Sequence, residues 1–153
     1  MLKIGDVAPE FSLLSDLNQM VSLSGLKGKK VILYFYPKDN TPGCTREACD
    51  FRDEMPAFFE KNAEVIGVSK DGPEKHLKFK QKYSLTHTLL ADTTGDVCVA
   101  YGVMDTKSMF GRSFLGIKRT TFLIDESGII RAIWRKVKVN GHTQQVLDEL
   151  NNS

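Results

Sequence analysis

Two of the three cysteines lie close together, in the stretch NTPGCTREACDF at residues 40–51. Cys44 follows a loop rich in proline and glycine (residues 37–43) and stands at the start of a predicted helix. The first turn of a helix has unpaired N–H groups and a partial positive charge, which lower the pKa of a cysteine placed there. Cys44 is therefore a candidate nucleophile, and the hydroxyl of the nearby Thr41 can lie beside its sulfur.

The spacing of Cys44 and Cys49 restricts what the two thiols can do together. Five residues of helix rise about 7.5 Å and rotate about 140°, so the two Cα atoms lie roughly 8.6 Å apart. A disulfide requires Cα atoms within about 7 Å of each other. An intact helix therefore forbids the bond, whereas an unwound helix start permits it, because a short helix is only marginally stable alone. The spacing favours a two-step cycle in which Cys44 becomes a sulfenic acid and then condenses with Cys49.

A structural role for the cysteines is the alternative at this point, because a free cysteine often packs as a small apolar side chain. We interpret Cys98, in GDVCVAY, in this way. A metal site is disfavoured, because two thiolates lack the third and fourth ligands that zinc requires. The three histidines are scattered without ligand spacing, so we interpret them as surface or packing residues; they are His76, His87 and His142.

Composition limits the functions to consider. A chain of 153 residues with 41% apolar and 26% charged residues predicts one domain over residues 1–153 with a packed core. The formal net charge of +2 gives no reason to expect nucleic acid or an anionic membrane as a partner. We recognise neither a signal peptide nor a run of transmembrane length, and we expect a cytoplasmic protein. In that reducing compartment, three cysteines favour chemistry or packing over a disulfide framework.

The elements that must position Cys44 follow an α/β pattern. The run VILYFY at 31–36 is typical of a strand buried on both faces, and Pro37 ends it. A helical pattern begins at Cys44, and Pro56 interrupts it. Other expected elements are an N-terminal β-hairpin (11–16 and 19–23), a strand at 64–70, a helix at about 73–83, a strand near 88–92, a short helix within 94–102, a hairpin at 120–136 and a helix at 142–152. This order predicts a central mixed β-sheet flanked by helices, with Trp134 in the core.

The stretch YPKDNTPGCTREACDFRD resembles the active-site stretch of the peroxiredoxins, whose pattern is Pro-x-x-x-Thr/Ser-x-x-Cys. Pro37, Thr41 and Cys44 fill that pattern. The segments KGKKVILYFYPKDNTPGCT, EVIGVSKDGPEKHLKFKQKYSL, LLADTTGDVCVAYGV and GIKRTTFLIDESGII are similar to the bacterioferritin comigratory protein, or peroxiredoxin Q, subfamily. The likeness covers nearly the whole chain.

The resemblance implies a thioredoxin-like fold and the activity of a thiol peroxidase. It assigns Cys44 as the peroxidatic cysteine, Cys49 as the resolving cysteine and Arg119 as the cation that contacts thiolate and peroxide. It further implies that Thr41 binds sulfur and substrate and that the backbone N–H of Gly43 is a donor to the substrate.

In the same reading, Pro37 shields the site from water. The implied substrates are hydrogen peroxide and alkyl hydroperoxides, and the implied reductant is thioredoxin or a glutaredoxin. No metal, haem or flavin is expected as a cofactor, and the subfamily favours a monomer.

Three other functions use similar residues. A disulfide reductase of the thioredoxin type would need C-x-x-C, which the chain lacks around Cys44. A glutathione-peroxidase-like protein would carry Gln and Trp motifs around its cysteine, and we do not recognise them here. A redox sensor could use Cys44 and Cys49 with the opening of the helix as its output. Rapid peroxide consumption with turnover favours the enzyme, and slow stoichiometric oxidation favours the sensor.

Overall fold

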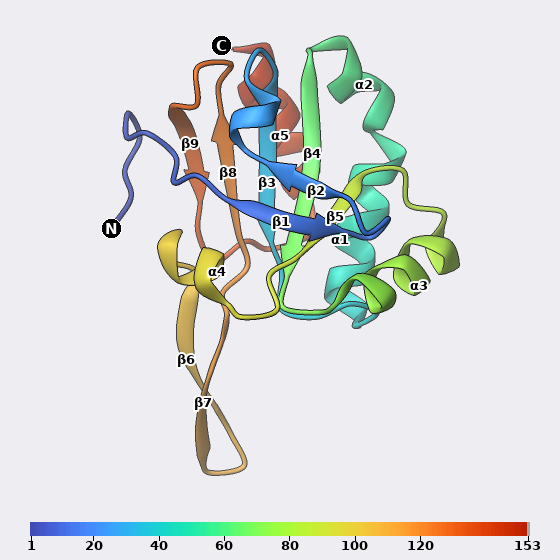
Figure 1. Cartoon of the computed structure of the whole chain (residues 1–153), viewed down its shortest axis with the longest axis vertical. Coiled ribbons are helices and arrows are strands. Elements are labelled where there is room, and N and C mark those ends of the chain that lie inside the picture. Colours follow the sequence, from blue (N-terminus) through green and yellow to red (C-terminus); the bar gives the residue numbers. More distant parts are fainter. Residues whose placement is uncertain (153) are drawn as a thin grey trace.

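The computed structural model describes residues 1–152 and has a mixed seven-stranded sheet at its centre (Figure 1). The strands lie in the order β2-β1-β5-β4-β3-β8-β9. The central strands β3, β4 and β5 are parallel, and the other neighbours are antiparallel. Their bounds are β1 Ser12–Ser15, β2 Met20–Ser22, β3 Lys30–Phe35, β4 Ala63–Ser69, β5 Thr88–Ala91, β8 Thr120–Ile124 and β9 Ile130–Trp134. The expected mixed sheet and N-terminal β-hairpin are confirmed.

β3 forms the centre of the core because its side chains alternate between two buried faces. Ile32 and Tyr34 belong to one apolar cluster, and Val31, Leu33 and Phe35 belong to a second cluster. All five side chains are almost completely buried. The prediction of a strand buried on both faces is therefore confirmed.

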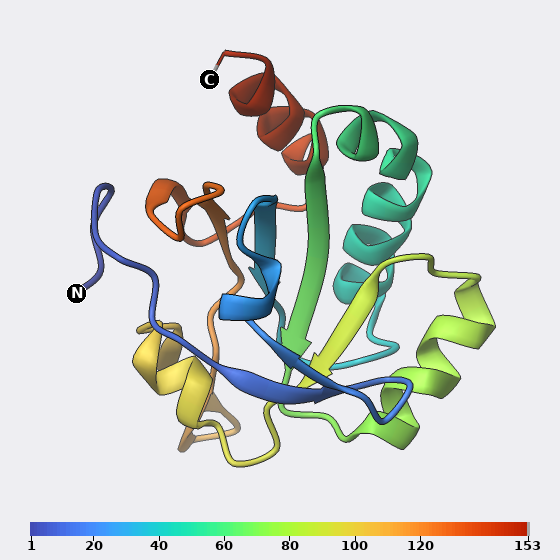
Figure 2. The same cartoon turned by 45° about the horizontal axis from the view of Figure 1, so that its top comes forward.

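Helices cover both faces of the sheet. Four of them contribute buried side chains to the first cluster, namely α1 (Pro42–Asp53), α2 (Met55–Glu60), α3 (Pro73–Tyr83) and α5 (His142–Asn151). The short helix α4 (Asp96–Ala100) packs into the second cluster, and it lies apart from the other four helices (Figure 2). Within residues 1–152, no helix is both long and apolar enough to cross a membrane.

The helix that begins near Cys44 is interrupted, as the sequence predicted. α1 ends at Asp53, and α2 begins at Met55 with Pro56 in its first turn. A proline is tolerated there because the first N–H groups of a helix have no partner within the helix. The break at Glu54 therefore separates the cysteine-bearing helix from the next one.

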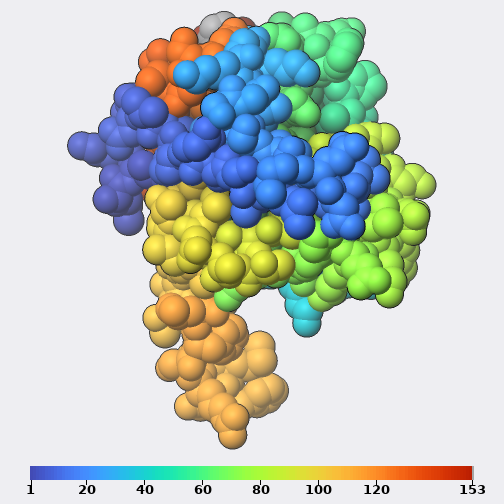
Figure 3. Space-filling view, in the orientation of Figure 1, coloured from blue at the N-terminus to red at the C-terminus, as the bar shows by residue number. Residues whose placement is uncertain are grey.

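A further hairpin, which the sequence patterns did not reveal, projects from the body of the molecule (Figures 1 and 3). It consists of β6 (Met104–Met109) and β7 (Arg112–Ile117), which pair only with each other. The turn is Phe110-Gly111, and both residues have positive φ, of 52° and 76°. Hairpin turns of this kind usually carry Asn-Gly or Asp-Gly. Because Phe110 stands where Asn or Asp is usual, the sequence did not indicate a turn here.

Candidate active site

The register of the sheet brings Arg119 to Cys44. β8 runs antiparallel to β3, with Thr120 opposite Phe35. Arg119 directly precedes β8, so it lies beside the chain that leaves β3 and leads into α1. The N–H of Val137 donates to the carbonyl of Arg119 at 3.0 Å, which fixes the backbone there. Cys44 occupies the first turn of α1 and is 2% exposed.

The guanidinium of Arg119 contacts two acidic side chains at once. Its Nη2 donates to Sγ of Cys44 at 3.4 Å, and its Nη1 donates to Oε1 of Glu47 at 2.7 Å. A cation held against a buried sulfur stabilises the thiolate over the thiol. The structure thus brings together Cys44 and Arg119, two site residues expected from the sequence, and it adds Glu47.

The electrostatics of this group are set by burial and by mutual attraction. Burial alone would lower the pKa of Arg119, but the charges of Glu47 and Cys44 raise it above its ordinary value. Burial raises the pKa of Glu47 to about 7, against the opposing attraction of Arg119. Arg119 is therefore a permanent cation, whereas Glu47 can carry a proton near neutral pH.

Gly43 permits the close approach of Arg119 to the helix start. A Cβ atom at this position would lie 3.1 Å from Nη2 of Arg119. A side chain would therefore press the guanidinium away from Cys44. The N–H of Gly43 belongs to the first turn of α1, whose N–H groups find no acceptor within the helix.

Thr41 stands at the N-cap of α1, and its hydroxyl has a defined role there. Oγ1 donates to the carbonyl of Lys38 at 2.9 Å, so its proton is used within the loop and its lone pairs are left to accept. The carbonyl of Thr41 accepts from the N–H of Thr45 at 2.8 Å. Pro37 is half-buried at the other end of the same loop. The predicted contact of the Thr41 hydroxyl with sulfur and substrate stays a prediction.

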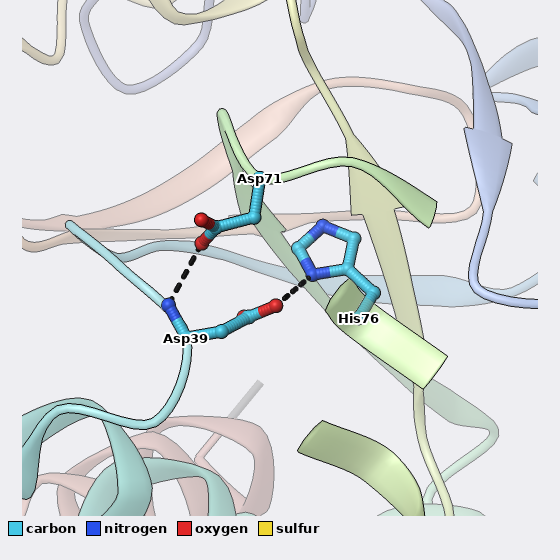
Figure 4. Close-up of side chains that lie close together, drawn as sticks. All are labelled: Asp39, Asp71 and His76. Carbon is cyan, nitrogen blue, oxygen red and sulfur yellow. Dashed lines mark hydrogen bonds and ion pairs between the residues drawn. The ribbon is translucent and has the colours of Figure 1, made fainter. Parts of the chain in front are cut away.

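The loop that leads into α1 is fastened to α3 by a buried polar network (Figure 4). Nδ1 of His76 lies 2.6 Å from Oδ2 of Asp39, and Nε2 of His76 donates to the carbonyl of Leu90 at 2.9 Å. The hydroxyl of Tyr36 donates to Oδ1 of Asp39 at 2.5 Å. The N–H of Asp39 donates to Oδ2 of Asp71 at 2.7 Å. This network holds the loop beside Cys44 without contacting the sulfur.

Asp39, Asp71 and His76 also form a group that could hold a metal ion, since one potential ligand atom of each lies within 4.8 Å of the others. The sequence spacing gave no sign of this grouping. His76 and Asp39 are already bonded to each other, and Asp71 accepts from the hydroxyl of Ser69 and the ammonium of Lys75. These partners satisfy the three side chains, so we interpret the cluster as an anchor for the loop.

The histidines are interior residues. His76, His87 and His142 are 0%, 2% and 2% exposed, so the surface alternative is wrong and the packing interpretation holds. Nε2 of His87 lies 2.7 Å from the hydroxyl of Tyr34, and Nε2 of His142 lies 2.8 Å from that of Thr121. Burial lowers the pKa of His87 to about 3, so its imidazole is neutral at physiological pH.

Cys49 lies in the same helix as Cys44 and is half-buried. Both thiols are free, as the helical spacing requires. Burial raises the pKa of Cys49; the positive charge of Arg52 opposes this shift, and the carboxylates of Asp53 and Asp50 add to it. Cys49 is thus held as a thiol while α1 is intact.

The third cysteine, Cys98, is a packing residue, as expected. It is completely buried in the second apolar cluster. Its N–H donates to Oδ2 of Asp92 at 2.8 Å. Burial and then the Asp92 carboxylate raise the pKa of Cys98 well above its ordinary value.

Comparison with known proteins identifies the family. The model of the AhpC/TSA family matches residues 4–133. The putative peroxiredoxin bcp of Coxiella burnetii is 54% identical over 149 residues, which cover 97% of this chain and 99% of that protein. The chain belongs to the AhpC/TSA family and is a peroxiredoxin. Peroxiredoxin Bcp of Bacillus subtilis is 49% identical to this peroxiredoxin over 149 residues, covering 97% of this chain and 95% of the relative.

Solved structures place this peroxiredoxin with the Bcp and PrxQ proteins. The Xanthomonas campestris bacterioferritin comigratory protein, described for its alkyl peroxide reduction activity, has a TM-score of 0.91 and 36% identity, covering 99% of this chain and 97% of that chain. A mutant of Xylella fastidiosa PrxQ has a TM-score of 0.93 and 36% identity, with the same coverage. The expected thioredoxin-like fold and peroxidase class of this peroxiredoxin are thereby confirmed.

Proposed function

We propose that this peroxiredoxin reduces hydrogen peroxide and organic hydroperoxides through Cys44, with Cys49 completing the cycle. The proposal rests on the 3.4 Å contact between Nη2 of Arg119 and the buried sulfur of Cys44, at the start of α1. A fixed cation and the first turn of a helix both favour the thiolate, which is the nucleophilic form. The alkyl peroxide reduction of the Xanthomonas campestris relative supports organic hydroperoxides as substrates.

In the first step, the thiolate of Cys44 attacks the hydroxyl oxygen of the hydroperoxide. The S–O bond forms as the O–O bond breaks, which leaves Cys44 as a sulfenic acid. The departing hydroxide or alkoxide takes up a proton and becomes water or an alcohol. Negative charge moves from sulfur to oxygen during this displacement, so the guanidinium of Arg119 can stabilise the transition state throughout.

The neighbouring groups have complementary roles in this proposal. The N–H of Gly43 donates to a peroxide oxygen, and Oγ1 of Thr41 accepts the hydrogen bond of the hydroperoxide while its own O–H donates to the Lys38 carbonyl. Pro37 limits the access of water. This arrangement orients the O–O bond along the line of attack from Cys44.

In the second step, the first turns of α1 unwind and Cys49 condenses with the sulfenic acid. Water leaves, and a Cys44–Cys49 disulfide forms. The intact helix holds the two thiols apart, so unwinding must precede the bond. The break at Glu54 supports this step, because it gives the unwinding a defined limit before α2.

A dithiol protein then reduces the disulfide by thiol–disulfide exchange. We expect thioredoxin, or a glutaredoxin, in the cytoplasm, where such proteins are kept reduced. We expect the peroxidase to work as a monomer. Sustained consumption of NADPH with thioredoxin, thioredoxin reductase and peroxide would support this partner. Turnover with the glutaredoxin system and none with the thioredoxin system would identify a glutaredoxin as the reductant instead.

The cycle is tested by mixing the reduced protein with one equivalent of hydrogen peroxide in a stopped-flow instrument, followed by mass analysis of its peptides. We expect rapid oxidation, the loss of two hydrogen atoms and a bridge between Cys44 and Cys49. Slow stoichiometric oxidation, or a bridge that involves Cys98, would overturn the proposal and favour a sensor.

A further inference from the structure

Glu47 has a buried carboxyl group of which only one oxygen atom accepts a hydrogen bond. The residue is 1% exposed, and its Oε1 accepts from Arg119 at 2.7 Å. Its Oε2 is buried and has no hydrogen-bond partner among the described residues 1–152. An ionised carboxylate in that position is costly, because a buried charge needs compensation at each oxygen. This cost favours the protonated acid whenever a second anion competes for the same cation.

In the proposed reaction, the thiolate form of Cys44 is that second anion. One guanidinium contacts both side chains, Sγ through Nη2 and Oε1 through Nη1. The single positive charge of Arg119 can offset only one negative charge in full. Two anions on adjacent nitrogens of one buried guanidinium repel each other, so only one of the two groups ionises readily.

We propose that Cys44 and Glu47 share one proton in the reduced protein, with Glu47 holding it as a carboxylic acid while Cys44 is a thiolate. The proposal rests on the assignment of Cys44 as the nucleophile. The exchange conserves charge: thiol plus carboxylate becomes thiolate plus carboxylic acid. Burial, which raises the pKa of Glu47 to about 7, agrees with this exchange.

The groups around Glu47 leave Arg119 as the cation that decides its state. On its own helix, the Asp50 carboxylate adds negative charge and so favours the protonated form of Glu47. From β3, the buried hydroxyl of Tyr34 is neutral, because burial raises its pKa well above the ordinary value. From α5, burial lowers the pKa of His142, which keeps that imidazole neutral at physiological pH.

The shared proton gives Glu47 a part in the overall reaction. When the sulfur becomes a neutral sulfenic acid, Arg119 is left with one acidic neighbour, and Glu47 ionises. In the balanced reaction, the thiolate, the hydroperoxide and the carboxylic acid are converted to the sulfenic acid, the alcohol and the carboxylate. The proton that the leaving alkoxide requires is thus matched by the proton that Glu47 releases, with no net uptake from the solvent. Glu47 acts through Arg119 and is therefore a positioning residue. It carries one proton in the reduced protein and releases it on oxidation.

The test is a count of protons with the variant Glu47→Gln. Gln keeps the volume and an oxygen acceptor for Nη1 of Arg119, but it cannot ionise. Reduced protein is mixed with one equivalent of hydrogen peroxide in weak buffer with a pH indicator, at a pH where ultraviolet absorbance shows that Cys44 is a thiolate. We expect net uptake close to zero protons per Cys44 oxidised in the original protein and close to one in Glu47→Gln. Equal uptake in the two proteins would overturn the proposal.

The matched control is Asp53→Asn, which removes a carboxylate paired with Arg52 at the other end of the same helix, away from Arg119 and Glu47. It should behave as the original protein does in the proton count. A variant that loses its circular dichroism spectrum is uninformative about the proton, so a second measurement uses the unaltered chain. Infrared difference spectra should show a protonated carboxyl band in the reduced protein that disappears on oxidation by one equivalent of peroxide. An unchanged carboxyl region would equally refute the shared proton, whereas failure of Cys44 to react would refute the proposed function itself.

Discussion

Cys44 and Cys98 are two buried cysteines in helices, and the charges beside them are opposite. Cys44 is 2% exposed and Cys98 is 0% exposed. The Arg119 guanidinium donates a hydrogen bond to the sulfur of Cys44. At Cys98 the Asp92 carboxylate accepts from the Cys98 N–H and disfavours the thiolate, and it outweighs the weaker opposing effect of Lys70.

Burial alone does not select a reactive thiol. Desolvation disfavours the thiolate at any buried cysteine, and it is the largest cause of the raised pKa of Cys98. A reactive buried cysteine therefore requires a cation and donors that outweigh desolvation. At Cys44 the start of α1 offers N–H donors and Arg119, directly before β8, offers the cation, whereas α4 has only five residues and its cysteine faces the second apolar cluster.

Substitution of the two cysteines should give the largest difference in peroxidase activity. Cys44→Ser should abolish peroxide reduction, because a serine hydroxyl is not ionised near neutral pH and cannot become a sulfenic acid. Cys98→Ala should retain near-normal turnover, because it removes only packing volume. A peroxidase assay with thioredoxin and its reductase measures both. Residual turnover in Cys44→Ser, or loss of turnover in a folded Cys98→Ala, would show that the two thiols do not differ in the way proposed.

Removal of the cation should have the next largest effect. Arg119→Ala should slow the oxidation of Cys44 by about 10²–10³-fold, the cost of losing one transition-state donor. In this variant, the absorbance of the Cys44 thiolate should also appear at a higher pH than in the original protein. The control is Arg131→Ala, because Arg131 is a more exposed arginine paired with Asp125. An unchanged thiol titration in Arg119→Ala would show that the charge of Arg119 does not distinguish Cys44 from Cys98.

Cys49→Ser should separate the first oxidation from the recycling step. The first reaction with peroxide should keep its rate and leave one added oxygen on Cys44. Turnover with thioredoxin should fall about tenfold or more, because an intramolecular reaction is replaced by one between molecules. Mass analysis and the coupled assay measure the two steps. Normal cycling of this variant would show that Cys49 does not resolve the sulfenic acid.

The smallest effect distinguishes burial from charge at Cys98. Asp92→Asn keeps a side-chain oxygen as acceptor but removes the negative charge, so it should lower the pKa of Cys98 by about a unit or less. Because burial persists, alkylation of Cys98 at neutral pH should stay slow, and a modest rise should appear only at alkaline pH. Rapid alkylation at neutral pH would mean that Asp92, not burial, keeps this thiol inert.

Local patterns in the sequence predicted most elements near the site. The apolar run of β3, the Pro/Gly-rich loop and the helical spacing from Cys44 are each contained in one short segment. α3 and the break at Pro56 were likewise signalled by prolines at helix starts. The β6–β7 hairpin was missed because Phe110 occupies a turn position with positive φ that Asn or Asp usually takes.

Two features of the site depend on long-range contacts that local sequence patterns cannot predict. Glu47 shares a helical face with Cys44, three residues away, and that spacing was the one signal available. Its burial and its bond to Arg119 follow from the packing of α1 on the sheet. The bond between Asp39 and His76 joins a loop to α3 across 37 residues. Sequence spacing cannot show such a contact.

Local sequence patterns were enough to predict that a cysteine stands at the start of a helix after a buried strand, with a second cysteine too far along the helix to bond with it. Chain-local geometry fixes both facts, since they depend on helical rise and on backbone preferences. The cation beside Cys44, in contrast, depends on the tertiary structure. Arg119 reaches Cys44 across 75 residues because the antiparallel register of β3 and β8 places the end of one strand beside the start of the other.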